Sequence, residues 1–158
     1  MEDNVALAIT RIALIDPGHP SISEFREAAR EALAPVGKRA LAAKEWGEAA
    51  RAFRDLLAVV PDDETAHDGL VKALSRLGWQ RRRQGEHGTA LEHADELLNL
   101  EPESFSGLRL RAESLSSLER YEEAVTAFRA AMRVRPKHKE TRRGYWRARA
   151  KVTDEPQR

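Results

Sequence analysis

The fold is decided by the stretch EWGEAARAFRDLLAVVPDD (residues 45–63) and by two later stretches with the same pattern. These are EHGTALEHADELLNLEPES (86–104) and RYEEAVTAFRAAMRVRPKH (120–138), and all three align without gaps on a proline. An alanine lies twelve residues before each proline, at Ala49, Ala90 and Ala124. Apolar residues recur at helical spacing in each stretch, so each is predicted to be an amphipathic helix.

A second helical stretch precedes each of these, at residues 34–43, 66–83 and 105–118, so that three helical hairpins are expected. The alignment on the prolines extends into these first helices. A small residue lies twenty-four positions before each proline, at Gly37, Gly78 and Ala112. Phe53 and Phe128 lie eight positions before theirs, where the middle stretch has Ala94 instead. Small residues at such positions let two helices approach closely.

This pattern resembles the tetratricopeptide repeat (TPR) family. Its unit is a helix–turn–helix of 34 residues with small, aromatic and proline positions in this order. The resemblance covers roughly residues 33–152. It implies an all-α solenoid, a right-handed superhelix of about three helical hairpins with flanking helices.

The spacing between the prolines locates the repeats. Pro102 and Pro136 are 34 residues apart, whereas Pro61 and Pro102 are 41 apart. Because seven extra residues make about two helical turns, the excess is interpreted as a lengthened first helix over roughly 63–84. A single domain is expected over 1–152, followed by a flexible tail at 153–158. Its parts are N-terminal flanking helices (1–32), repeat one (33–63), repeat two with the lengthened helix (64–104), repeat three (105–138) and a closing helix (139–152).

Both ends of a repeat array need a cover. The apolar stretch at 5–15 is expected to be the second helix of an incomplete unit. A further long helix is expected from about residue 21 towards Lys44, with a kink at Pro35. In the closing helix, Tyr145 and Trp146 are expected to bury against the third hairpin.

Composition excludes several classes of protein. The 158 residues include 27 Lys and Arg, 26 Asp and Glu, and no cysteine, which excludes a disulfide framework, a thiolate nucleophile and a cysteine-ligated metal site. No apolar run reaches the roughly 18 residues of a membrane span, and the first residues lack the positive charge of a signal peptide. A cytoplasmic location is expected. The excess of arginine over lysine is typical of a GC-rich bacterial genome.

No residues in a catalytic or metal-binding pattern were found. The five histidines show no metal-ligand spacing, and neither a phosphate-binding loop nor a nucleophile motif is present. We therefore expect no enzymatic activity, no cofactor and no metal.

The resemblance implies a binding site on the first helices, because in TPR proteins they line a concave groove that receives a peptide or a partner helix. The candidates face away from the apolar seams: Lys38, Lys72, Trp79, Arg82, Arg83, Arg109, Arg143 and Arg147. Basic residues outnumber acids such as Glu113 there. Trp79 beside Arg82 and Arg83 is interpreted as a binding hot spot. In the alternative interpretation, Trp79 only packs on its neighbour at the solvated end of a long helix.

The expected function is a non-catalytic protein-interaction module, or scaffold, that binds an acidic peptide or partner helix in this basic groove. Co-chaperone members of the family hold a peptide's terminal carboxylates with lysines, asparagines and an arginine. The only asparagines here are Asn4 and Asn99, and neither lies on a groove-lining helix. Recognition of chaperone tails in that manner is therefore not supported.

Other functions remain open. The chain could self-assemble through its terminal helices as a homo-oligomer, with the stretch at 5–15 as the contact. It could also be an accessory interaction domain of a larger enzyme. Single-stranded RNA binding is a weaker alternative, because the base-reading residue pairs of RNA-binding repeats are absent.

Overall fold

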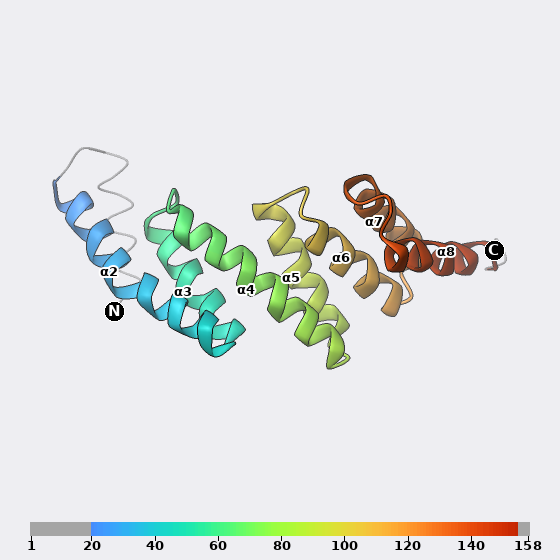
Figure 1. Cartoon of the computed structure of the whole chain (residues 1–158), viewed down its shortest axis with the longest axis horizontal. Coiled ribbons are helices and arrows are strands. Elements are labelled where there is room, and N and C mark those ends of the chain that lie inside the picture. Colours follow the sequence, from blue (N-terminus) through green and yellow to red (C-terminus); the bar gives the residue numbers. More distant parts are fainter. Residues whose placement is uncertain (1–19, 155–158) are drawn as a thin grey trace. The chain divides into compact units, whose positions relative to one another are not determined.

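The computed structural model describes residues 20–154 and has seven helices in that range, with no strand among them (Figure 1). The helices are α2 (Pro20–Ala43), α3 (Trp46–Val59), α4 (Glu64–Arg83), α5 (His87–Leu100), α6 (Phe105–Ser117), α7 (Tyr121–Val134) and α8 (Lys139–Asp154). The predicted all-α helical-repeat fold is confirmed. The helix expected at 5–15 lies outside the described residues. No helix in the described range has the length and apolar character that crossing a membrane requires.

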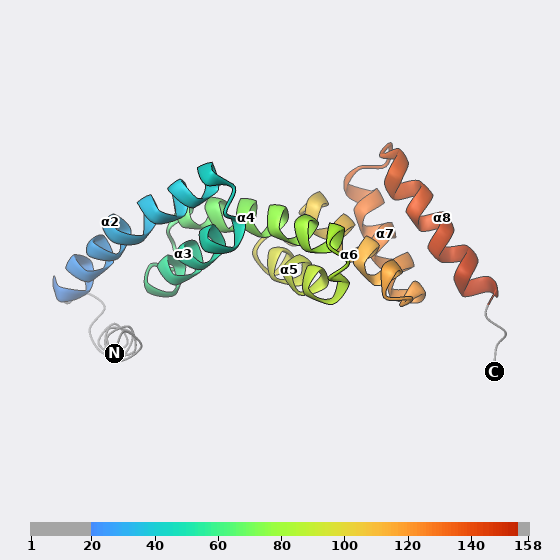
Figure 2. The ribbon, with the colours of Figure 1, turned by 90° about the horizontal axis from the view of Figure 1, so that it is seen from below.

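The chain divides into two compact units at a boundary inside α4, after Ala73. In the first unit, α2 packs against α3. In the second unit, α6 packs against both α5 and α7, and α7 packs against α8 (Figure 2). In the second unit, the hairpin of α6 and α7 shares one core cluster with the following helix α8.

Two of the helices are long. The lengthened first helix of the second hairpin is α4, and α2 is a long helix with Pro35 inside it. The flexible tail was expected to start at residue 153, but α8 continues through Thr153 to Asp154. The Thr153 hydroxyl donates to the carbonyls of Arg149 and Ala150, which supports this last helical turn.

Two phenylalanines form the centre of the packing between consecutive helices. Phe53 is 1% exposed and lies between two glycines of the first unit. A Cβ built on Gly37 would be 2.6 Å from the ring, and one built on Gly69 would be 2.4 Å from it. In the second unit, a Cβ on Gly144 would be 2.5 Å from the ring of Phe128. Each aromatic ring therefore occupies space that neighbouring glycines leave free.

The middle repeat fills the same space from a different helix. Its second helix has Ala94 at the aromatic position. Eight residues after the proline, the other two repeats are followed by a glycine, Gly69 or Gly144, whereas the middle repeat is followed by Leu110. Both Ala94 and Leu110 are fully buried in one cluster. A Cβ on Gly78 would be 2.3 Å from Leu110 Cδ2. In the middle repeat, the large side chain that fills this space is therefore supplied by the first helix of the next repeat and not by the second helix of its own.

The turn within each hairpin also follows the repeat. Lys44, Gly85 and Glu119 each lie seventeen residues before their proline, and they have φ angles of 62°, 82° and 62°. The amide of the next residue bonds back to a carbonyl in the last turn of the first helix, as in Glu86 N to Arg81 O at 3.0 Å. This is a glycine-type helix end, in which a left-handed residue satisfies the last carbonyls.

Glycine at the two non-glycine turns is expected to stabilise the protein. A side chain in the left-handed region is disfavoured, so Lys44→Gly and Glu119→Gly should each raise the free energy of unfolding by about 0.5–1 kcal/mol. Gly85→Ala should lower it by about 1 kcal/mol. Urea unfolding of the three variants provides the measurement, and a destabilised Glu119→Gly protein would contradict this account of the turn.

Asp63 caps α4 and ties it to α2 within the first unit. Its Oδ1 accepts the Ala66 amide at 2.8 Å, and its Oδ2 accepts Arg30 Nε at 2.9 Å. Partial burial raises the pKa of Asp63, but the Ala66 amide and the Arg30 guanidinium outweigh this and leave the pKa below its ordinary value. The ionised carboxylate is therefore the form that the folded protein prefers.

This depressed pKa predicts how stability depends on pH. The contribution of Asp63 is complete above the unfolded-state pKa of about 3.9 and is lost as the pH falls through the lower folded-state pKa. Asp63→Asn should thus destabilise the protein at pH 7 and have a much smaller effect near pH 2. Urea titrations of both proteins at the two pH values test this, and an equal difference at both would contradict it.

Candidate partner-binding site

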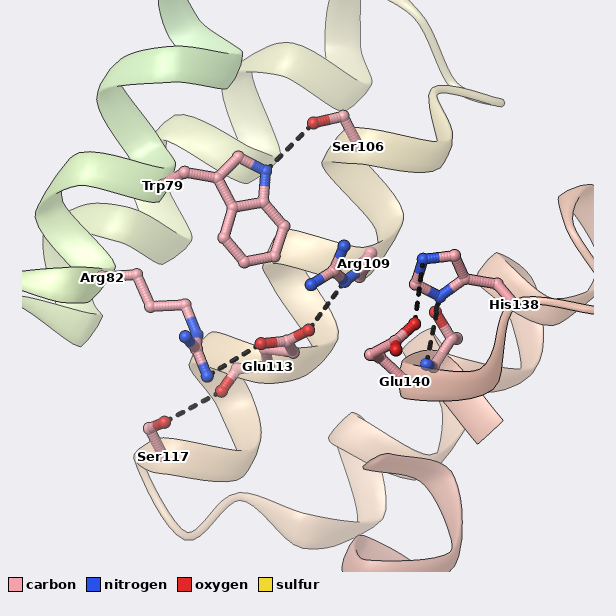
Figure 3. A network of polar contacts seen from close by, with 9 residues as sticks. Trp79, Arg82, Ser106, Arg109, Glu113, Ser117, His138 and Glu140 are labelled. Carbon is pink, nitrogen blue, oxygen red and sulfur yellow. Dashed lines mark hydrogen bonds and ion pairs between the residues drawn. The ribbon is translucent and has the colours of Figure 1, made fainter. Parts of the chain in front are cut away.

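The structure brings together some of the predicted site residues. Trp79, Arg82 and Arg109 lie side by side in the second unit (Figure 3). Arg83 is exposed at the end of α4. Lys38 and Lys72 are exposed on α2 and α4 in the first unit.

Trp79 is engaged within the second unit. Its ring is partly buried and packs against the cluster of Ala90, Ala94 and Leu110. The indole Nε1 donates to Ser106 Oγ at 3.1 Å, and the Arg109 guanidinium lies 4.6 Å from the ring centroid. The packed alternative therefore describes Trp79 better than an exposed hot spot does. Its N–H and one ring face are already occupied.

Glu113 is the centre of the polar contacts around this tryptophan. Its Oε2 lies 2.8 Å from Arg82 NH2, and its Oε1 accepts Arg109 Nε at 2.8 Å (Figure 3). The Glu113 side chain is 16% exposed, whereas the two arginine side chains are 29% and 28% exposed. Sequence reasoning placed Glu113 on this face but did not identify it as the partner of both arginines. Nothing in the spacing alone indicates that two helices supply cations to one carboxylate.

Two open clefts meet at Glu113 and Arg147. The larger, of about 620 Å³, is lined by residues of α6 and α8: Arg109, Glu113, Glu140, Arg143, Trp146 and Arg147. The second, of about 430 Å³, extends along α8 to Lys151 and has Tyr121 and Phe128 in its lining. The clefts therefore combine cationic walls with apolar surface.

The open cations of these clefts lie on α8. Arg143, Arg147 and Lys151 are exposed and follow one another at four-residue intervals, which places them in one row about 6 Å apart. We call these three residues the α8 row. None of them is ion-paired with a carboxylate in the described part of the chain. The α8 row can accept acidic groups without breaking an existing pair.

Trp146 adjoins the α8 row. It was expected to bury with Tyr145, but only Tyr145 is buried, and Trp146 is 59% exposed. Consecutive helical residues point about 100° apart, so only one of the two can face the core. The Tyr145 hydroxyl lies 3.5 Å from Arg129 NH2 and 3.0 Å from Arg149 NH1, and these two cations lower its pKa. Sequence reasoning thus missed Trp146 as a candidate binding residue.

The start of α8 is held by His138. Its Nδ1 accepts the Thr141 amide at 3.2 Å and lies 2.8 Å from the buried Thr141 hydroxyl. Its ring meets the edge of Phe105 on α6, with centroids 4.9 Å apart. These contacts fix the first turn of α8 against α6 and so position the walls of the larger cleft.

The described residues do not cluster in a way that suggests metal binding. Between residues 20 and 154, no group of three or more histidine, aspartate or glutamate side chains is arranged to hold a metal ion.

Comparison with known proteins finds similarity to TPR proteins. No family model matches the chain. A curated relative, the small glutamine-rich tetratricopeptide repeat-containing protein 2 of Mycosarcoma maydis, is 25% identical over 125 residues. The match covers 79% of this chain and 33% of the relative, so the chain spans about a third of that relative's length.

Solved structures of TPR domains share the fold. The C-terminal TPR-containing domain of a putative FK506-binding protein of Plasmodium falciparum has a TM-score of 0.58 at 17% identity, over 84% of this chain and 93% of that one. The P58(IPK) TPR domain has a TM-score of 0.57 at 16% identity, over 99% and 43%. The first TPR of Spaghetti (RPAP3), bound to the HSP90 peptide SRMEEVD, has a TM-score of 0.53 at 13% identity, over 77% and 91%. The resemblance seen in the sequence is confirmed at the level of the fold: the described helices have the helical-repeat fold of solved TPR domains.

Proposed function

We propose that the chain is a non-catalytic protein-interaction module, and that it binds an acidic segment of a partner protein along α8, in the clefts that α8 forms with α6. The observation that carries this proposal is the α8 row, because Arg143, Arg147 and Lys151 are exposed cations without a described ion-pair partner. Guanidinium groups bind carboxylates through a planar fork of donors, which favours an acidic ligand.

The surroundings of the row support a protein ligand. Trp146 offers exposed aromatic area beside Arg143 and Arg147, and buried aromatic and arginine contacts dominate the energy of many protein interfaces. The fold can also hold a peptide, since the first TPR of Spaghetti is seen with an HSP90 peptide.

Affinity capture from a lysate of the cells that make the protein tests this proposal. The intact chain is compared with Arg143→Glu/Arg147→Glu and with a control, Arg133→Glu/Arg142→Glu. The control has the same charge change at exposed arginines that do not line the clefts. We expect mass spectrometry to find a partner with the intact chain and the control but not with the cleft variant.

Other outcomes would change the proposal. A partner retained equally by all three proteins would place recognition away from the α8 row. Capture of only further copies of this chain would instead favour self-assembly.

A further inference from the structure

We infer that Glu113 is a specificity-determining residue: it occupies the Arg82–Arg109 pair as an internal carboxylate and thereby excludes acidic partner groups from that pair. The inference rests on the proposed function, because it concerns the same clefts. It adds that the partner's acidic groups are directed to the α8 row.

The geometry shows that the arginine pair is already satisfied. Glu113 meets Arg82 with one carboxylate oxygen and Arg109 with the other, each at 2.8 Å. The two arginines come from different helices, α4 and α6, so a single carboxylate pairs with a cation from each and offsets half of their charge. A carboxylate from a partner would have to displace Glu113 to use them.

The position of Glu113 extends its effect to the partner. It lines both clefts, as does Arg147. An acidic group placed next to Glu113 would meet its carboxylate and would have to compete with it for Arg82 and Arg109, and close like charges are unfavourable at an interface. The same group placed beside Arg143 or Lys151 would meet an open cation. Glu113 therefore selects partners whose charges follow α8.

A matched control separates this role from the general effect of charge. Glu140 lines the larger cleft too, and its carboxylate lies 3.4 Å from His138. A backbone hydrogen bond and the charges of His138, Arg109 and Arg143 lower its pKa, but no arginine in the described range is within ion-pair distance of it. Glu113→Gln and Glu140→Gln change the net charge equally. Only Glu113→Gln releases two guanidinium groups into the clefts.

The test is fluorescence anisotropy with a fluorescein-labelled octaglutamate peptide as the probe. Relative to the wild type, Glu113→Gln should bind about five- to tenfold more tightly, and Glu140→Gln should change affinity by about twofold at most. The gain should disappear in Glu113→Gln/Arg82→Gln/Arg109→Gln. Circular dichroism confirms that each variant is folded, and Glu113→Met, of similar length, replaces Glu113→Gln if the latter is not.

Each outcome decides a separate point. Equal gains for the Glu113 and Glu140 variants, or no gain for either, would overturn the inference while leaving the proposed function in place, provided that wild-type binding still requires Arg143 and Arg147. Absence of binding in every variant would overturn both. A gain that persists without Arg82 and Arg109 would show that Glu113 acts only through net charge.

Discussion

Replacing Leu110 with alanine is expected to lower the free energy of unfolding by about 2–5 kcal/mol. Leu110 is fully buried and fills the space over Gly78 that a phenylalanine fills in the other two repeats. Its removal would leave a cavity between α4, α5 and α6. Urea unfolding followed by circular dichroism measures the loss. Leu118→Ala, at a 38% exposed leucine, is the control, with an expected change within about 0.5 kcal/mol.

A double variant tests directly whether the side chains at positions 94 and 110 fill the same space. Ala94→Phe alone should overpack against Leu110 and destabilise by about 1–3 kcal/mol. Combined with Leu110→Gly, it recreates the glycine–phenylalanine–glycine arrangement of Gly37, Phe53 and Gly69. The double variant should therefore be more stable than the sum of the single effects predicts, by about 2 kcal/mol. Strictly additive effects would show that the two positions do not share one space.

The second large effect is expected at Phe53. Phe53→Ala should lower the free energy of unfolding by about 3–5 kcal/mol, because the ring is 1% exposed and packs between two helices over Gly37 and Gly69. Neither glycine has a side chain that could collapse into the cavity. Val134→Ala, at a 40% exposed valine, controls for loss of an apolar side chain. A loss of less than about 1 kcal/mol at Phe53 would mean that the ring is not at the centre of the core.

Most of the fold could be predicted from the sequence because small and large side chains recur at fixed positions in each repeat. Ala49, Ala90 and Ala124 are all fully buried where the aligned stretches placed them. The sequence showed that Ala94 departs from the pattern. It did not show that Leu110 fills the space of the missing aromatic ring, because Leu110 lies on the next helix and meets Ala94 only in the folded chain. The need for glycine at positions 69 and 144 likewise became clear only from the structure, in which the rings of Phe53 and Phe128 lie against them.

The binding site could be predicted only in part. The sequence identified basic residues on the first helices, and Arg143 and Arg147 are indeed open cations. It could not show that Arg82 and Arg109 are ion-paired with one carboxylate, because the 2.8 Å contacts with Glu113 depend on how α4 and α6 pack. It also assigned Trp146 to the core, and it left open whether Trp79 is an exposed binding residue or packs on its neighbour. In α8 most neighbours of Trp146 are basic, so apolar spacing does not determine which of the adjacent Tyr145 and Trp146 faces the core.

The measurement that tests the central claim most directly is a titration of the intact chain with fluorescein-labelled octaglutamate, with octaglutamine as the neutral probe. The account predicts binding of octaglutamate that weakens with added salt and that is lost in Arg143→Gln/Arg147→Gln but kept in Arg133→Gln/Arg142→Gln. Equal binding by these two double variants, or equal binding of the acidic and neutral probes, would contradict the claim that the α8 row receives an acidic partner.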